Sequence, residues 1–383
     1  MKNKTIAFIA NFTGIFLFGV SMVIIGSILP VLKARFGMSD IEAGGLFTIL
    51  PIGLLIGAIF FGPIVDRFGY RGVLSVASLF LALGFAGIAY SPSVGLLSAC
   101  IFFFGIGGGT INGATSALVS DLSEGKGKII NLNWLGMFYG VGAFSMPLAL
   151  SIVSDEHLIT VLNIAAVLSL LSAFFFLIIK YPIMVQKEKI TLKVIPAFVK
   201  NKLFITITFY LFFQSAFEAI VNNWSVSYFI DSLGMDQGKA LVALSYSVMG
   251  LVIMRLLIGS IFKNFTHNRL INISLSLLII GALGLMINGY VYNSVGMILL
   301  GAGLAPGFPV MLGLVGEMYK EVSGTAFSFA MLVALIGNTL INYTTGVLTN
   351  HFGMQAYIYV VLTVIVSMIL VYSIIRKLDK LNP

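Results

Sequence analysis

The sequence GPIVDRFGYR, residues Gly62 to Arg71, is a short charged segment between two long apolar runs, and it decides the fold. Its glycines permit a tight turn, because glycine adopts backbone conformations that other residues avoid. Asp66, Arg67 and Arg71 add one acid and two bases, which can pair with each other or with the end of a nearby helix. The segment therefore predicts a sharp polar connection between two long apolar elements.

The two flanking runs, and ten others along the 383-residue chain, have the composition of membrane-spanning helices. Hydrophobic residues make up 59% of the chain and charged residues only 9%. Apolar runs of about 18 residues or more cross a bilayer as helices, and these runs lack the alternation of a β-barrel. We therefore expect an all-α integral membrane protein with twelve spans, at residues 6–29, 41–62, 73–90, 94–119, 132–153, 157–179, 203–230, 240–262, 270–289, 295–317, 326–348 and 356–375.

The basic residues predict the orientation, because cytoplasmic loops carry an excess of lysine and arginine. With both termini inside, 18 of the 22 basic residues fall in cytoplasmic segments, and only Lys33, Arg35 and Lys239 fall in outer loops. The remaining basic residue, Arg255, lies within a span. We expect cytoplasmic N and C termini. Compact loops and the lack of a targeting segment favour a bacterial inner membrane.

The two halves of the chain repeat. Gly37 precedes the second span as Gly234 precedes the eighth, at an offset of 197, and Gly105 matches Gly301 at an offset of 196. Two parallel six-helix repeats are typical of transporters that bind their solute between the repeats. We expect an N-terminal bundle, a basic cytoplasmic linker and a C-terminal bundle, at residues 1–179, 180–202 and 203–383.

The charged segment resembles the G-x3-D-[RK]-x-G-x-[RK] signature of the major facilitator superfamily, and it stands between the second and third predicted spans. The resemblance covers essentially the whole chain. It implies a transporter whose cytoplasmic side is latched closed by Asp66, Arg67, Arg71 and Asp121. The second repeat has Lys263 in place of the acid, so we expect a one-sided latch.

Three looser patterns resemble the fucose/glucose/galactose porter branch of that superfamily: Glu218-x5-Trp224, YGVGAFSMP at Tyr139–Pro147 and GAGLAPGFP at Gly301–Pro309. Fucose-transporting members carry carboxylates in the first and fourth spans. This chain has Asn11 and Asn112 in those spans, which puts proton coupling by the same residues in doubt. Pro306 and Pro309 are expected to kink the tenth span, as a gating hinge or a static bend.

Glu218 stands in the seventh predicted span, 16 residues from the nearest lysine. An ionisable side chain at such a depth is expensive and indicates a function. Gln214, Asn222 and Ser225 share its helical face, and this set of amides and a carboxylate suits a hydroxyl-rich solute. We expect Glu218 to exchange a proton during transport or to bind Na⁺. The alternative is a structural carboxylic acid bonded to Gln214 or Asn222.

Further polar residues in the spans are candidates for a shared solute cavity: Asn11, Asn112, Asn338 and Asn342. Asparagines in membranes also simply tie helices together. Trp224 is a platform for an apolar sugar face or an interfacial anchor.

Arg255 is predicted to lie too far from Glu218 for a direct pair. At 1.5 Å per residue the two lie about 12 Å and about 24 Å above the nearest cytoplasmic lysines. We expect Arg255 to reach toward the cytoplasm and pair with Glu317 as an inner gate. The alternative is separate contacts of both with backbone and water.

These observations favour a secondary transporter of a small polar solute, with a monosaccharide and proton symport through Glu218 as the leading hypothesis. The alternatives are a proton-driven drug or solute exporter and an uncoupled or Na⁺-coupled sugar carrier. A G-P-x2-G-G run typical of exporters is missing from the fifth span, and no nucleophile with a base, metal-ligand cluster or phosphate-binding lysine motif points to an enzyme or a cofactor. The expected partners are the solute, H⁺ or Na⁺ and membrane lipid, not nucleic acid, and the expected state is a monomer.

Overall fold

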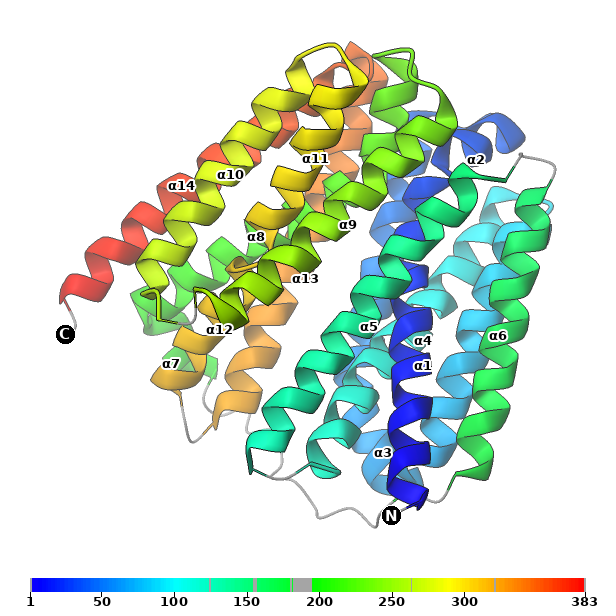
Figure 1. Cartoon of the computed structure of the whole chain (residues 1–383), viewed down its shortest axis with the longest axis vertical. Helices are drawn as coiled ribbons and strands as arrows, with labels where there is room; N and C mark the ends of the chain where they lie inside the picture. Colours follow the sequence, from blue (N-terminus) through cyan, green and yellow to red (C-terminus); the bar gives the residue numbers. More distant parts are fainter. Residues whose placement is uncertain are drawn as a thin grey trace. The chain divides into compact units, whose positions relative to one another are not determined.

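The computed structural model describes residues 2–123, 125–153, 157–179, 181, 195–262, 264–319 and 322–381. These parts of the chain are helical and contain no strand (Figure 1). The helices are α1 (Lys2–Ser27), α2 (Leu29–Phe36), α3 (Asp40–Tyr90), α4 (Val94–Asp121), α5 (Gly125–Ser151), α6 (Leu158–Ile178), α7 (Ile195–Lys200), α8 (Lys202–Asp231), α9 (Gln237–Ser260), α10 (His267–Met286), α11 (Tyr290–Leu304), α12 (Gly307–Met318), α13 (Ser323–Phe352) and α14 (Ala356–Leu381).

Twelve helical segments within the described ranges are long and apolar enough to cross a membrane, which confirms the all-α, twelve-span prediction. Large apolar side chains such as Leu83, Phe174 and Leu370 are exposed on them. In a bilayer such side chains meet lipid, so the exposure carries no penalty. The short helices α2 and α7 were not expected. They lie in stretches predicted as an outer loop and as the linker.

The charged segment forms a sharper connection than a loop. Helix α3 continues through Gly62 and is interrupted only at Gly69, where φ is 72° and ψ is 166°. A positive φ of this kind is readily adopted only by glycine. The predicted tight turn is present at Gly69, whereas Gly62 keeps helical geometry.

The first compact unit comprises Met1–Met38 and Gly45–Lys187. In this unit α1 packs against α4, α5 and α6. Glycines bring α3 and α4 close together, because Gly53 and Gly105 face each other and Gly107 faces the backbone of Ala77. Both halves of α3 thus pack on the same helix.

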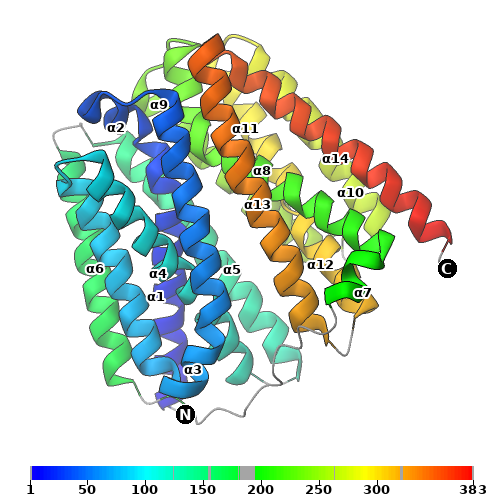
Figure 2. The same ribbon diagram turned by 180° about the vertical axis from the view of Figure 1, so that it is seen from behind.

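The second compact unit comprises Ser39–Gly44 and Glu188–Pro383. Its centre is α8, which packs against α13 and α14 and also contacts α9 and α12 (Figure 2). Helix α11 packs between α9 and α10. The expected linker, 180–202, falls largely outside the described residues, so the predicted domain limits remain a proposal.

The tenth span is broken, as the prolines predicted. Helix α11 ends at Leu304 and α12 begins at Gly307, with Pro306 between them. The last carbonyls of a helix have no partner within that helix, so carbonyls at the end of α11 need other donors. The Gln214 amide donates to the Leu304 carbonyl at 2.9 Å, and the Ser274 hydroxyl donates to the carbonyl of Gly303.

Candidate functional site

Glu218 lies in the middle of α8, in the second unit, and is half-buried. Within the described part of the chain its carboxylate receives no hydrogen bond and forms no ion pair. The charge of Arg255, an exposed residue on the neighbouring helix α9, acts on this carboxylate. The site therefore combines a half-buried acid with a cation inside the spans.

The depths of Glu218 and Arg255 estimated from residue counts predict only part of this arrangement. They predicted no direct pair between Glu218 and Arg255, and none is seen among the described residues. They did not anticipate that the charge of Arg255 would still act on Glu218. Residue counts measure depth only for upright helices that begin at one level, and the reference residue Lys263 lies outside the described ranges.

Glu317, the expected partner of Arg255, is instead at a cavity of about 420 Å³. Residues from α8, α12 and α14 line this cavity, and Arg255 is not among them. The Arg255–Glu317 gate therefore remains a prediction.

The polar stripe of α8 divides into buried and accessible members. Gln214 is fully buried and bonds the end of α11, and its amide also lies against Gly307. Asn222 is half-buried, and no hydrogen bond of its side chain is found in the described ranges. Of the four residues in this stripe, Glu218 and Asn222 are half-buried, whereas Gln214 and Ser225 are fully buried.

Trp224 is fully buried, so it is not an anchor at the membrane surface. Its indole N–H donates to Oδ1 of Asn342 on α13, over 3.2 Å. The amide of Asn223 donates to the same oxygen, over 3.1 Å. Sequence reasoning missed Asn223, because helical periodicity places it off the Glu218 stripe.

Asn342 and Asn338 lie one turn apart on α13. Asn342 is fully buried, whereas Asn338 is half-buried. The amide of Asn342 donates to the backbone carbonyl of Asn338 at 2.8 Å and to its Oδ1 at 3.1 Å. Asn338 is therefore the half-buried end of a series of hydrogen bonds that starts at Trp224 and passes through Asn342.

The candidates of the first unit differ from each other. Asn11 is fully buried on α1 and donates to the Ala7 carbonyl of its own helix at 2.7 Å. Its Oδ1 has no partner among the described residues. Asn112 is exposed on α4. The cavity that these residues were expected to share with the second unit remains a prediction.

The latch prediction falls partly outside the described residues, because the side chains of Asp66 and Asp121 are not among them. Arg67 is exposed, with its guanidinium 5.3 Å from the ring centre of Phe68. The charge of Arg71 acts on Tyr181, whose pKa is raised by burial. No sequence pattern pointed to this electrostatic influence on Tyr181, and the latch stays a proposal.

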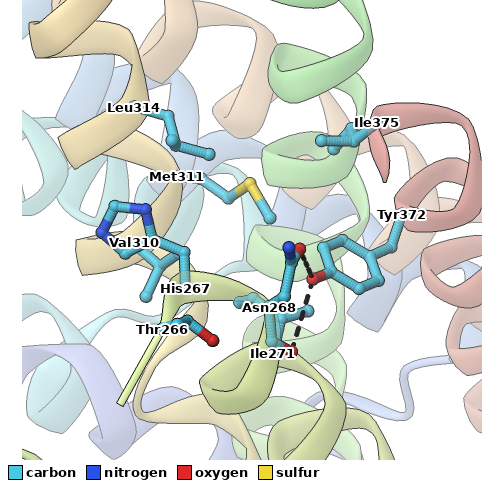
Figure 3. A pocket seen from close by; sticks show the side chains of 9 residues that line it. All are labelled: Thr266, His267, Asn268, Ile271, Val310, Met311, Leu314, Tyr372 and Ile375. Carbon is cyan, nitrogen blue, oxygen red and sulfur yellow. Dashed lines mark hydrogen bonds between the residues drawn. The ribbon is translucent and has the colours of Figure 1, made fainter. Parts of the chain in front are cut away.

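A second, smaller cavity of about 160 Å³ lies at one end of the second unit (Figure 3). Its polar wall is a hydrogen bond from the Tyr372 hydroxyl to Oδ1 of Asn268, at 2.6 Å. Leu314 and Ile375 line both cavities. Helix α12, which follows the break in the tenth span, thus lines both cavities.

The family described as Major Facilitator Superfamily matches residues 12–298 of this chain. The inner membrane transport protein YdiN of Escherichia coli (strain K12) is 23% identical over 89% of this chain and 82% of its own length. The cis,cis-muconate transport protein of Acinetobacter baylyi is 25% identical, over 69% of this chain and 66% of its own length. The family and both relatives are membrane transporters, which confirms that the chain is not an enzyme.

Solved structures share the fold. The nucleoside transporter NupG has a TM-score of 0.80 at 15% identity, over 99% of this chain and 100% of its own. A D-xylose-proton symporter has a TM-score of 0.74 at 16% identity, over 95% and 97%. A variant of the Escherichia coli fucose:proton symporter FucP has a TM-score of 0.65 at 16% identity, over 97% and 99%. At these identities the likeness concerns the fold alone.

Proposed function

This chain belongs to the Major Facilitator Superfamily, and from that premise we propose that it is a proton-coupled secondary transporter of a small polar solute, working by alternating access. The observation that carries the proposal is Glu218, a half-buried carboxylate within a span that has no hydrogen bond among the described residues. Such a group can bind and release a proton as its surroundings change. Na⁺ is the alternative coupling ion.

The first candidate solute is a monosaccharide. Glu218, Asn222 and Asn338 together offer amide donors and amide and carboxylate acceptors, which suits a molecule with several hydroxyl groups. Helices α8 and α13, which carry them, pack against each other. The likeness of the fold to a D-xylose-proton symporter supports this candidate.

The second candidate solute is a small organic acid, and Arg255 favours it. A guanidinium binds a carboxylate through two parallel hydrogen bonds, and this one is exposed inside a span with its charge acting at Glu218. Once Glu218 is protonated, a solute carboxylate could supply the negative charge near Arg255. The muconate transport protein, a relative of this chain, is named for such a dicarboxylate.

We place the protein in the inner membrane as a multi-pass monomer with both termini in the cytoplasm. The relative YdiN is named as an inner membrane protein, and the distribution of basic residues supports the orientation. In this proposal the broken tenth span and the charged turn at Gly69 serve as the moving parts. Asp66, Arg67, Arg71 and Asp121 close the cytoplasmic side.

The test is uptake of labelled D-xylose and labelled cis,cis-muconate into proteoliposomes, with and without an inward proton gradient. One pH unit can drive about tenfold accumulation of a neutral solute carried with one proton. We expect the native protein to respond to the gradient and the Glu218→Gln variant to lose the response. Asp236→Asn is the matched control, because it removes a carboxylate charge but keeps a good N-cap for α9.

Each result has a distinct meaning. Uptake that ignores the gradient in the native protein would leave a facilitator or Na⁺ coupling. A gradient response that survives in Glu218→Gln would remove Glu218 from coupling. Absence of uptake of both solutes, with efflux of a cationic dye against the gradient, would favour the exporter instead.

A further inference from the structure

Only one orientation of the Asn342 amide fits its surroundings. The indole N–H of Trp224 can donate but cannot accept. The atom of Asn342 that faces it at 3.2 Å must therefore be the oxygen. The amide of Asn223 donates to this oxygen as well, so the NH₂ group of Asn342 is directed away from α8.

The orientation of Asn342 fixes the orientation of Asn338. The Asn342 NH₂ group can only donate, and the side-chain atom it meets at 3.1 Å is therefore the Asn338 oxygen. The NH₂ group of Asn338 is left outside the network. It has no hydrogen-bond partner in the described ranges, and it is not fully buried.

Asn338 and Glu218 lie in the same stretch of the packed helices α8 and α13, between two contacts that join these helices. One contact between the helices lies at Gly337, which faces the backbone of Phe212. The other joins Asn342 to Asn223. Glu218 lies between the two contact positions on α8, and Asn338 lies between the two contact positions on α13. Both residues therefore occupy the same stretch of the helix pair.

We propose that Asn338 is the hydrogen-bond donor that this site presents to its solute, and that Trp224 and Asn342 are positioning residues that fix this polarity. The inference rests on the proposed function, because it concerns the same solute. It adds a requirement that the solute offers an acceptor oxygen toward α13, such as a carboxylate or a ring oxygen. Trp224 itself does not touch the solute.

The test is the KM of uptake for D-xylose and for cis,cis-muconate. Asn338→Asp keeps the shape of the side chain but turns the donor into an acceptor, so we expect KM to rise about tenfold or more, with kcat changed less than about twofold. Trp224→Phe removes the donor that fixes the network, and we expect a rise of about threefold. Asn350→Asp, at an exposed position on the same helix, is the charge control.

The double variant separates a positioning role from a merely structural one. With Asn338 already changed to Asp, the Trp224→Phe change should raise KM no further, although Trp224 and Asn338 make no hydrogen bond to each other in the described structure. Additive effects of the two substitutions would overturn the proposal. An unchanged KM in Asn338→Asp would do the same.

A chemical measurement keeps the inference testable if neither solute is transported. The single cysteine can be removed as Cys100→Ala, and Asn338→Cys is then treated with a maleimide in the native protein. We expect it to react, while Thr345→Cys, at a fully buried position on the same helix, stays unreacted. Equal protection of both would show that Asn338 is closed off and would overturn the proposal. Reaction of Asn338→Cys without uptake would mean that only the assigned solutes are wrong.

Discussion

At the scale of single residues, the charge of Arg35 has a specific use. Arg35 on α2 donates to the carbonyls of Ile88, Ala89 and Ser91 at 2.9 to 3.1 Å, where the third span ends. We expect Arg35→Ala to lower the free energy of unfolding by about 1 to 2 kcal/mol, because three carbonyls lose a charged donor. Arg35→Lys should restore only part of this, because an ammonium lacks the planar fork. Denaturant titration in detergent measures both, and equal stability of all three proteins would contradict the assignment. The sequence could not reveal this use, since the partners are more than 50 residues away. The same limit applies to the α8 stripe, where periodicity identified the polar face but not that Gln214 is already bonded and Glu218 is not.

At the scale of elements, the break in the tenth span was predictable and its closure was not. Pro306 acts locally, because it lacks an N–H and its ring disturbs the preceding turn, whereas the Gln214 bond to Leu304 joins residues 90 positions apart. A methyl group at Gly307 would collide with the Gln214 amide. We therefore expect Gly307→Ala to destabilise the protein by about 1 to 3 kcal/mol, although helix propensity alone would favour alanine by about 1 kcal/mol. In the Gln214→Ala background the same change should cost nothing, because the amide is gone. Thermal unfolding of the four proteins checks this, and a destabilisation that is equal in both backgrounds would show that the collision does not occur.

At the scale of the whole molecule, twelve spans could be counted from hydropathy because every span needs the same apolar length. The predicted orientation comes from 18 inner against 3 outer basic residues, and it is testable. In a Cys100→Ala background, Ser93→Cys should react with a membrane-impermeant maleimide on intact cells. Asn264→Cys should react only after permeabilisation, and both positions are exposed. The reverse pattern would invert the topology. The solute site could be predicted only as a list of polar residues, since which of them meet solvent depends on packing between distant helices such as α8 and α13.

The single-residue joint at Gly69 also bears on how the chain is made. Only one residue between the second and third spans departs from helical geometry, so no slack separates them. A nascent chain that has released one of these spans from the ribosome holds the start of the next directly behind it. We expect the two spans to enter the bilayer together as a helical hairpin, with the charged turn remaining on the side of synthesis.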